Sequence, residues 1–181
     1  MLGFYLAMLD TPEEKSVFEQ LYRLYRQDMF KTAYGILKNK YDSEDAVHEA
    51  FMRVIKKLTK ISEVNCPQTH AYLIIIVKNA ALKILEDQNK ISTVDIDTLN
   101  ITDDVDLEEK VISNMEVRRL KSILTKLSDD YYEILFLNIF MEFNVTEISE
   151  LLDITYDNAK KRLQRAKKKF IEAMEESKNA R

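Results

Sequence analysis

Glycine and proline are rare in this chain, and their scarcity restricts the folds that it can adopt. The 181 residues include two glycines and two prolines, whereas typical usage of about 12% for the pair leads one to expect roughly twenty. Sandwiches, barrels and glycine-rich phosphate loops need many tight turns, and such turns depend on these two residues. The composition therefore favours long helices and predicts an all-α fold.

The first helix has a clear start signal. Thr11 precedes Pro12 and is followed three residues later by Glu14, a pattern typical of a capped helix that begins at a proline. Apolar residues then recur at helical spacing from Val17 to Tyr25, and a second run of the same spacing continues to Leu37.

Two further helices are predicted in the first half of the chain. Residues 39–42 form a polar break, after which Asp42 or Ser43 is expected to cap a third helix that extends to about Leu58. A fourth helix is predicted from about Pro67 to Gln88. Its segment 71–77 is apolar all round, which predicts a buried helix.

The second half of the chain predicts a separate helical domain. Periodicity fades after residue 89 and returns at Leu107, and Ser128 is expected to cap a helix that extends to about Phe140. A short helix over about 145–152 precedes a final helix that starts near Tyr156. We therefore predict two helical domains, residues 12–90 and 107–178, joined by an acidic linker over 91–106.

Charge is distributed unevenly along the chain. The net charge is −4, yet residues 91–114 carry seven acidic and one basic side chain, whereas residues 155–181 carry nine basic and four acidic ones. Such asymmetry predicts polar partners of opposite sign at different places on the chain. The C-terminal segment suits phosphates, and the middle segment repels them.

The last two predicted helices form a helix-turn-helix candidate. About four residues join them, and Thr155 is well placed to cap the second helix. One face of that helix is apolar and includes Ala159 and Leu163, while the opposite face carries residue types that read base edges or hold phosphates. A solvated basic face on an ordinary terminal helix has the same pattern. The residues alone do not decide between this interpretation and a DNA-binding helix.

The third helix has acidic residues in its first turns and basic ones at its end, as the helix dipole favours, and an ordinary surface helix has the same pattern. Its string Glu44-Asp45-Ala46-Val47-His48-Glu49-Ala50-Phe51-Met52-Arg53 resembles the Glu-Asp-Ala-Val-Gln-Glu-Val-Phe-Leu-Arg signature of extracytoplasmic-function (ECF) sigma factors, which belong to the sigma-70 family.

The resemblance extends over about residues 18–175. His70-Ala71-Tyr72-Leu73 and Lys78-Asn79 resemble the Arg-Ala-Trp-Leu and Arg-Asn of that family. Residues 147–155 resemble Glu-Ile-Ala-Glu-Ile-Leu-Gly-Ile-Ser, and residues 158–168 resemble Thr-Val-Lys-Ser-Arg-Leu-x-Arg-Ala-Arg-Lys. Both halves match in order and spacing.

The resemblance implies a promoter-specific transcription initiation factor that binds bacterial core RNA polymerase and promoter DNA, with an anti-sigma factor as a further partner type in the family. The residues implied to bind polymerase are Glu44, Asp45, His48, Glu49, Met52 and Arg53. Those implied to bind the −10 promoter element are His70, Tyr72, Lys78, Asn79 and Lys83. Those implied to bind the −35 element are Thr155, Asn158, Lys160, Lys161, Arg162, Gln164, Arg165 and Lys168.

Two other functions stay open. A helix-turn-helix regulator that acts without polymerase would bind specific DNA alone. A sigma-like decoy would bind polymerase but fail to melt DNA. The acidic run Glu86-Asp87-Gln88 keeps the decoy open, because it stands where the family often has basic residues.

No enzyme signature is found, and no cofactor or metal is expected. An HExxH-like string that starts at His48 has Met52 where the second histidine is needed. One cysteine, Cys66, excludes an internal disulfide and indicates a reducing, cytoplasmic setting. No apolar run approaches the roughly 20 residues that span a bilayer, so no membrane insertion is expected.

Overall fold

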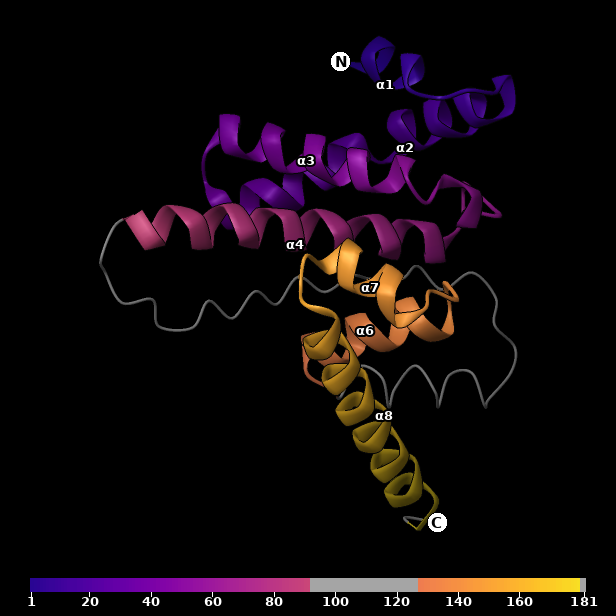
Figure 1. Ribbon diagram of the computed structural model, residues 1–181, viewed down its shortest axis with the longest axis vertical. Helices are drawn as coiled ribbons and strands as arrows, with labels where there is room; N and C mark the ends of the chain where they lie inside the picture. The colour runs from indigo at the N-terminus through magenta and orange to yellow at the C-terminus, as the bar shows by residue number, and fades with distance from the viewer. Residues whose placement is uncertain (92–126, 180–181) are drawn as a thin grey trace. The chain divides into compact units, whose positions relative to one another are not determined.

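The structure is a computed structural model and describes residues 1–91 and 127–179. Every regular element in these two ranges is a helix (Figure 1), which confirms the predicted all-α fold. The chain divides into an N-terminal unit, Met1–Asp106, and a C-terminal unit, Leu107–Arg181. Beyond Ile91 the predicted linker lies outside the described residues, as does the helix expected after Leu107. The exact domain limits therefore stay predictions.

Three long helices form the N-terminal unit. α2 (Pro12–Leu37), α3 (Lys40–Ile55) and α4 (Pro67–Ile91) pack against one another, and a short 3₁₀ turn, η1 (Leu58–Lys60), follows α3. Figure 1 shows α3 and α4 lying side by side. Large apolar side chains fill the space between the three helices, and the most deeply buried are Phe18, Leu21, Met29, Phe51, Tyr72, Leu73 and Ile76.

The start of α2 agrees with the sequence prediction. The Thr11 hydroxyl accepts a hydrogen bond from the Glu14 backbone N–H at 3.1 Å, and the Glu14 carboxylate accepts one from the Thr11 N–H at 3.2 Å. This reciprocal capping satisfies two donors that a helix start leaves without partners. The two apolar runs predicted before Leu37 belong to one continuous helix.

The predicted cap of α3 is wrong by three or four residues. Asn39, rather than Asp42 or Ser43, caps the helix, because its side-chain oxygen accepts hydrogen bonds from the backbone N–H groups of Tyr41 and Asp42 at 2.8 and 3.3 Å. Asparagine, aspartate and serine are all good capping residues, and the sequence analysis placed Asn39 in the polar break instead of at the cap. Ser43 is instead buried, and its hydroxyl donates to the Asn39 carbonyl.

The buried character predicted for residues 71–77 is confirmed. α4 packs against both α2 and α3, and within this segment Ile74 alone is half-buried while the other residues are buried. Contact with two partner helices explains why the segment lacks a polar face.

A short helix, α1 (Leu2–Ala7), precedes α2 and was not predicted. It packs on the N-terminal unit through Tyr5, whose side chain is buried, and the following Leu9 is buried as well. Six residues are too few for a helical period to show in the sequence.

The C-terminal unit contains a helix-turn-helix. α6 (Asp129–Ile139) packs against α8 (Tyr156–Asn179), and α7 (Val145–Leu152) packs against both. The predicted bounds of α7 and the predicted start of α8 are confirmed. Asp153 ends α7 in the left-handed conformation, with φ of 54°, which aspartate adopts more readily than most residues.

Candidate functional site

The residues expected to bind polymerase lie on one side of α3. The opposite side, which includes Ala46, Ala50 and Phe51, is buried against α2 and α4. Asp45 and Glu49 are exposed one turn apart, and His48 lies half-buried between them in sequence. Packing therefore fixes the direction in which these side chains point.

Two ion pairs organise this side of α3. Arg26 of α2 reaches both carboxylate oxygens of Glu44, at 2.9 and 2.6 Å, and its guanidinium carbon lies 5.9 Å from the centre of the Tyr22 ring. Within α3, Arg53 Nε lies 3.0 Å from Glu49 Oε1. The Glu44 pair links α2 to α3, so Glu44 has a structural contact within the unit that the sequence did not indicate.

His48 is in direct contact with α1. A hydrogen bond of 2.8 Å joins the Tyr5 hydroxyl and His48 Nδ1, and the Phe4 ring centre lies 5.8 Å from that of His48. Burial, followed by the nearby Tyr22, raises the pKa of Tyr5 to about 12. Its hydroxyl therefore keeps its proton at neutral pH. Sequence reasoning missed this contact because no short-range pattern connects residues 43 positions apart.

The residues expected to bind the −10 element are much less accessible. None of the five is fully exposed, and Tyr72 has 0% exposure. His70 stacks on Tyr25 with ring centres 5.4 Å apart, and the Asn79 amide donates to the Ile75 carbonyl at 2.8 Å. The Tyr72 ring is thus unavailable in this structure for the expected contact with the −10 element. Lys78 and Lys83 are half-buried on α4.

The loop between η1 and α4 exposes residues that sequence reasoning did not single out. Lys60, the last residue of η1, and Asn65 of the loop are exposed. The loop backbone is held by the Tyr25 hydroxyl, which donates to the Val64 carbonyl at 2.9 Å, and by the Thr69 hydroxyl, which donates to the Glu63 carbonyl. Burial raises the pKa of Tyr25, so this donor stays protonated. The loop is anchored at its base and offers polar side chains outward.

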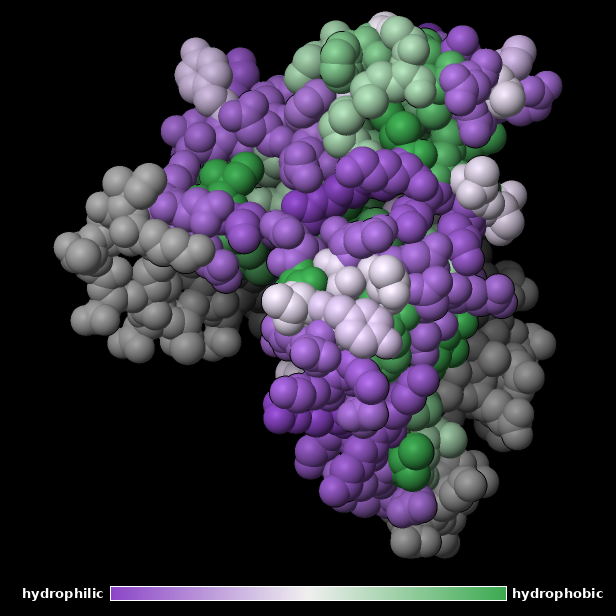
Figure 2. All heavy atoms as spheres, viewed as in Figure 1, coloured by the Kyte–Doolittle hydropathy of each residue, from purple (hydrophilic) through white to green (hydrophobic). Residues whose placement is uncertain are grey.

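The two faces of α8 divide as predicted. Ala159, Leu163 and Ala166 are buried, and Phe170 is half-buried. Figure 2 shows hydrophilic residues over most of the visible surface of this helix. The residues that point outward and are exposed are Asn158, Lys160, Lys161, Gln164, Arg165, Lys167 and Lys168. Thr155 caps the helix, because its hydroxyl accepts from the Asn158 N–H at 3.3 Å.

Arg162 differs from the other basic residues of α8. Its guanidinium forms an ion pair with Asp130 of α6 at 2.8 Å, and its side chain is 22% exposed. The family resemblance implies that Arg162 binds the −35 element, whereas in the structure its guanidinium makes a contact that joins α6 to α8.

Within residues 1–91 and 127–179, no group of three or more histidine, cysteine, aspartate or glutamate side chains could hold a metal ion. No helix in those ranges is long and apolar enough to cross a bilayer.

Two segments of the chain match known families. Residues 21–91 match Sigma-70 region 2, and residues 118–170 match Sigma-70 region 4. The chain belongs to the sigma-70 family. The region 2 match contains the candidate polymerase face of α3 and the whole of α4, and the region 4 match contains the helix-turn-helix and the basic face of α8.

Similar proteins support an assignment to the ECF type. The ECF RNA polymerase sigma factor SigM of Bacillus subtilis (strain 168) is 25% identical over 156 residues, which are 84% of this chain and 91% of SigM. SigX, another ECF RNA polymerase sigma factor of that organism, is 23% identical over 167 residues, 89% of this chain and 85% of SigX. The chain is thus an ECF RNA polymerase sigma factor.

A solved structure also matches this sigma factor. It contains the sigma factor RpoE in complex with the anti-sigma factor NepR from Bartonella quintana. The match has a TM-score of 0.40 and 18% identity, and it covers 87% of this chain and 96% of that one.

Proposed function

We propose that this sigma factor directs core RNA polymerase to specific promoters in the cytoplasm, and that it acts by binding rather than by catalysis. One observation carries the proposal: the exposed acidic face of α3 and the exposed basic face of α8 occur in one chain, in the order of regions 2 and 4. Polymerase binding is assigned to the first face and −35 DNA binding to the second.

The polymerase contact centres on Asp45 and Glu49. Both carboxylates are exposed on a helix whose other side is packed, so they meet a partner with little loss of conformational freedom. A basic partner surface gains charge-assisted hydrogen bonds from them. Glu44 has a supporting role in this assignment, since Arg26 of α2 contacts both of its carboxylate oxygens and its side chain is 31% exposed, whereas Glu49 pairs with Arg53 of α3 itself and is 52% exposed.

The −35 contact uses the first two turns of α8. Asn158 and Lys161 are exposed there, at the place where a recognition helix contacts base edges. Lys160, Arg165 and Lys168 are assigned to phosphates. Arg162 positions the helix through Asp130 rather than reading a base.

The −10 contact is assigned to the anchored loop before α4, together with half-buried His70. Lys60 at the end of η1 and Asn65 on this loop are exposed and supply a cation and an amide, which suit a phosphate and an unpaired base. Tyr72, 0% exposed, serves the core. This assignment separates the initiation factor from the decoy, because a decoy needs no such contact.

A binding experiment tests the polymerase assignment. The native chain is mixed with core RNA polymerase of Bacillus subtilis and applied to a sizing column, and we expect co-elution. A double variant, Asp45→Lys with Glu49→Lys, is expected to elute separately because it reverses the charge of the face.

The matched control is the double variant Glu86→Lys with Asp87→Lys. It makes the same change of charge at two exposed residues of α4, and we expect it to co-elute like the native chain. Failure of the native chain to co-elute, together with specific DNA binding by the chain alone, would instead identify a regulator that acts without polymerase.

A further inference from the structure

Tyr5 is the one buried side chain of α1 and anchors this helix on the N-terminal unit. Tyr5 is 1% exposed, and its ring centre lies 5.2 Å from that of Phe18 and 5.6 Å from that of Phe51. Its hydrogen bond to His48 ties α1 to the candidate polymerase face of α3. The helix therefore has a defined position beside that face.

The outward side of α1 is apolar. Phe4 is 56% exposed and Met8 is 44% exposed, and no charged side chain occurs between residues 1 and 9. Figure 2 shows hydrophobic residues gathered where α1 lies. A surface helix normally presents polar residues to water, so a contiguous apolar patch such as this one indicates contact with another molecule.

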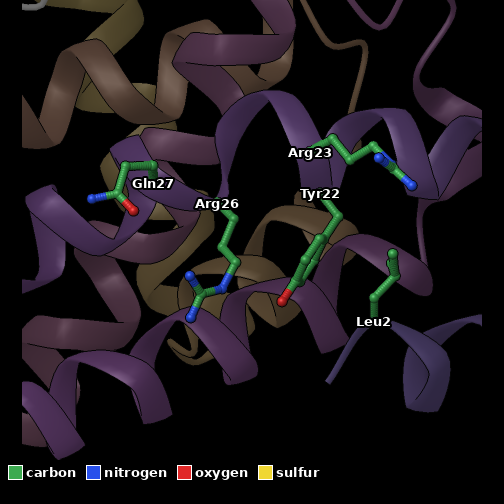
Figure 3. A pocket seen from close by; sticks show the side chains of 5 residues that line it. All are labelled: Leu2, Tyr22, Arg23, Arg26 and Gln27. Atoms are coloured by element: carbon green, nitrogen blue, oxygen red, sulfur yellow. The ribbon is translucent and has the colours of Figure 1, made fainter.

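The apolar patch is continuous with the polymerase face. Phe4 touches His48, so a partner that reaches His48 also meets Phe4. An open hollow lies where α1 meets α2, and Figure 3 shows Leu2, Tyr22 and Arg26 around it, together with Arg23 and Gln27. The hollow can receive a side chain of a partner that lies along both helices.

We propose that α1 extends the polymerase-binding face, so that Phe4 and Met8 contact core RNA polymerase next to the contacts of Asp45 and Glu49. The proposal rests on the proposed function, which takes α3 as the polymerase-binding helix. The matching polymerase surface has apolar side chains that meet α1 beside basic side chains that meet α3.

The packing of α1 argues against the opposite role, a cover that polymerase must displace. Displacement would expose the Tyr5 ring and break its bond to His48. A cover would also bury Phe4 and Met8, whereas these side chains keep exposed fractions of 56% and 44%. The geometry fits an α1 that forms part of the polymerase interface rather than one that blocks it.

Equilibrium binding to core RNA polymerase of Bacillus subtilis tests the proposal with the full chain. The variants are Phe4→Ser and Met8→Ser, and thermal melting of each variant checks its fold. The matched control is Leu24→Ser, which removes an equally exposed apolar side chain, 47% exposed. Leu24 lies about 200° around α2 from Tyr22, the residue that faces α1 and α3.

We expect each α1 variant to bind polymerase about fivefold to tenfold more weakly at an unchanged melting temperature, and Leu24→Ser to bind like the native chain. In the native chain, polymerase should also slow amide hydrogen exchange of residues 2–9. Unchanged or tighter binding by the α1 variants, or faster exchange in the complex, would overturn the proposal. The exchange measurement needs no variant, so it decides the question even if a substitution disturbs the fold.

The Asp45→Lys with Glu49→Lys variant separates the two assignments. If that variant loses binding while Phe4→Ser and Met8→Ser bind fully, the proposed function is supported and the role of α1 is rejected. Absence of binding by the native chain rejects the proposed function itself.

Discussion

At the scale of single residues, three side chains show how tertiary contacts change a role suggested by sequence. Arg162 has the residue type and position of a base reader, yet Asp130 holds it at 2.8 Å. The family resemblance implies that Tyr72 binds the −10 element, yet its exposure is 0%. His48 stands on the exposed side of α3 but bonds to Tyr5 from α1. The partners of Arg162 and His48 come from other helices, and Tyr72 lies on a helix that packs against two others, so neither spacing nor composition revealed these contacts.

Tyr5 gives a prediction about pH. Its pKa in the folded state is about 12, above the ordinary value of 10.0. The protonated hydroxyl therefore contributes its full stability below pH 10.0, and this contribution is lost as the pH rises toward about 12. The stability advantage of the native chain over Tyr5→Phe should therefore shrink by about 1 kcal/mol between about pH 9 and about pH 11. Chemical denaturation at the two pH values measures it.

The control for this prediction is Tyr41→Phe, which removes the hydroxyl of a tyrosine that is 80% exposed. Its stability difference from the native chain should change less between the two pH values. An equal change in both variants would show that burial of Tyr5 is not the cause.

At the scale of elements, the sequence predicted a helix correctly where local residues mark its start or its end. α7 was predictable because its apolar residues Ile148, Leu151 and Leu152 follow helical spacing and end just before Asp153. The start of α8 was predictable because Thr155 caps it. α2 was recognisable from Thr11 and Glu14. α1 was not recognisable from the sequence, since its apolar residues show no helical period and its position is fixed by contacts with α2 and α3.

The candidate site was predictable to different degrees on different helices. The exposed face of α8 follows from the spacing of Ala159, Leu163 and Ala166, because a helix packed on one side exposes the other. The −10 residues on α4 were predicted by resemblance alone, and that helix packs on two sides. The anchored loop before α4 depends on Tyr25, 39 positions from its bond partner Val64.

α8 gives a prediction at this scale. In the complex with polymerase, Lys160→Ala should weaken binding to all DNA fragments by a similar factor and lower the slope of log affinity against log salt by about 1. Lys161→Ala should instead cost about 1–3 kcal/mol on fragments that the native complex selects from a random library, and much less on unselected DNA. Fluorescence anisotropy at several salt concentrations distinguishes the two.

Lys169→Ala is the control for the α8 prediction. Lys169 is exposed but lies 3.2 Å from Glu172, further along the helix. It should change neither the preference among fragments nor the salt slope by a comparable amount. Equal effects from all three lysines would indicate a general basic face instead of a recognition surface.

At the scale of the whole molecule, the two units carry opposite surfaces. The N-terminal unit presents acidic residues of α3 beside apolar residues of α1, which suit a protein partner, and the C-terminal unit presents basic residues of α8, which suit DNA. The low content of glycine and proline fits both units, since the described elements of each are helices. Promoter-directed initiation requires both surfaces in the same molecule.

Transcription in vitro tests this central claim most directly. Core RNA polymerase of Bacillus subtilis is incubated with a DNA library with or without the protein, and the 5′ ends of the transcripts are mapped. The account predicts new, defined start sites that require the protein and disappear with Asp45→Lys plus Glu49→Lys. A stable complex with polymerase that yields no new start site would contradict the account and identify the protein as a sigma-like decoy.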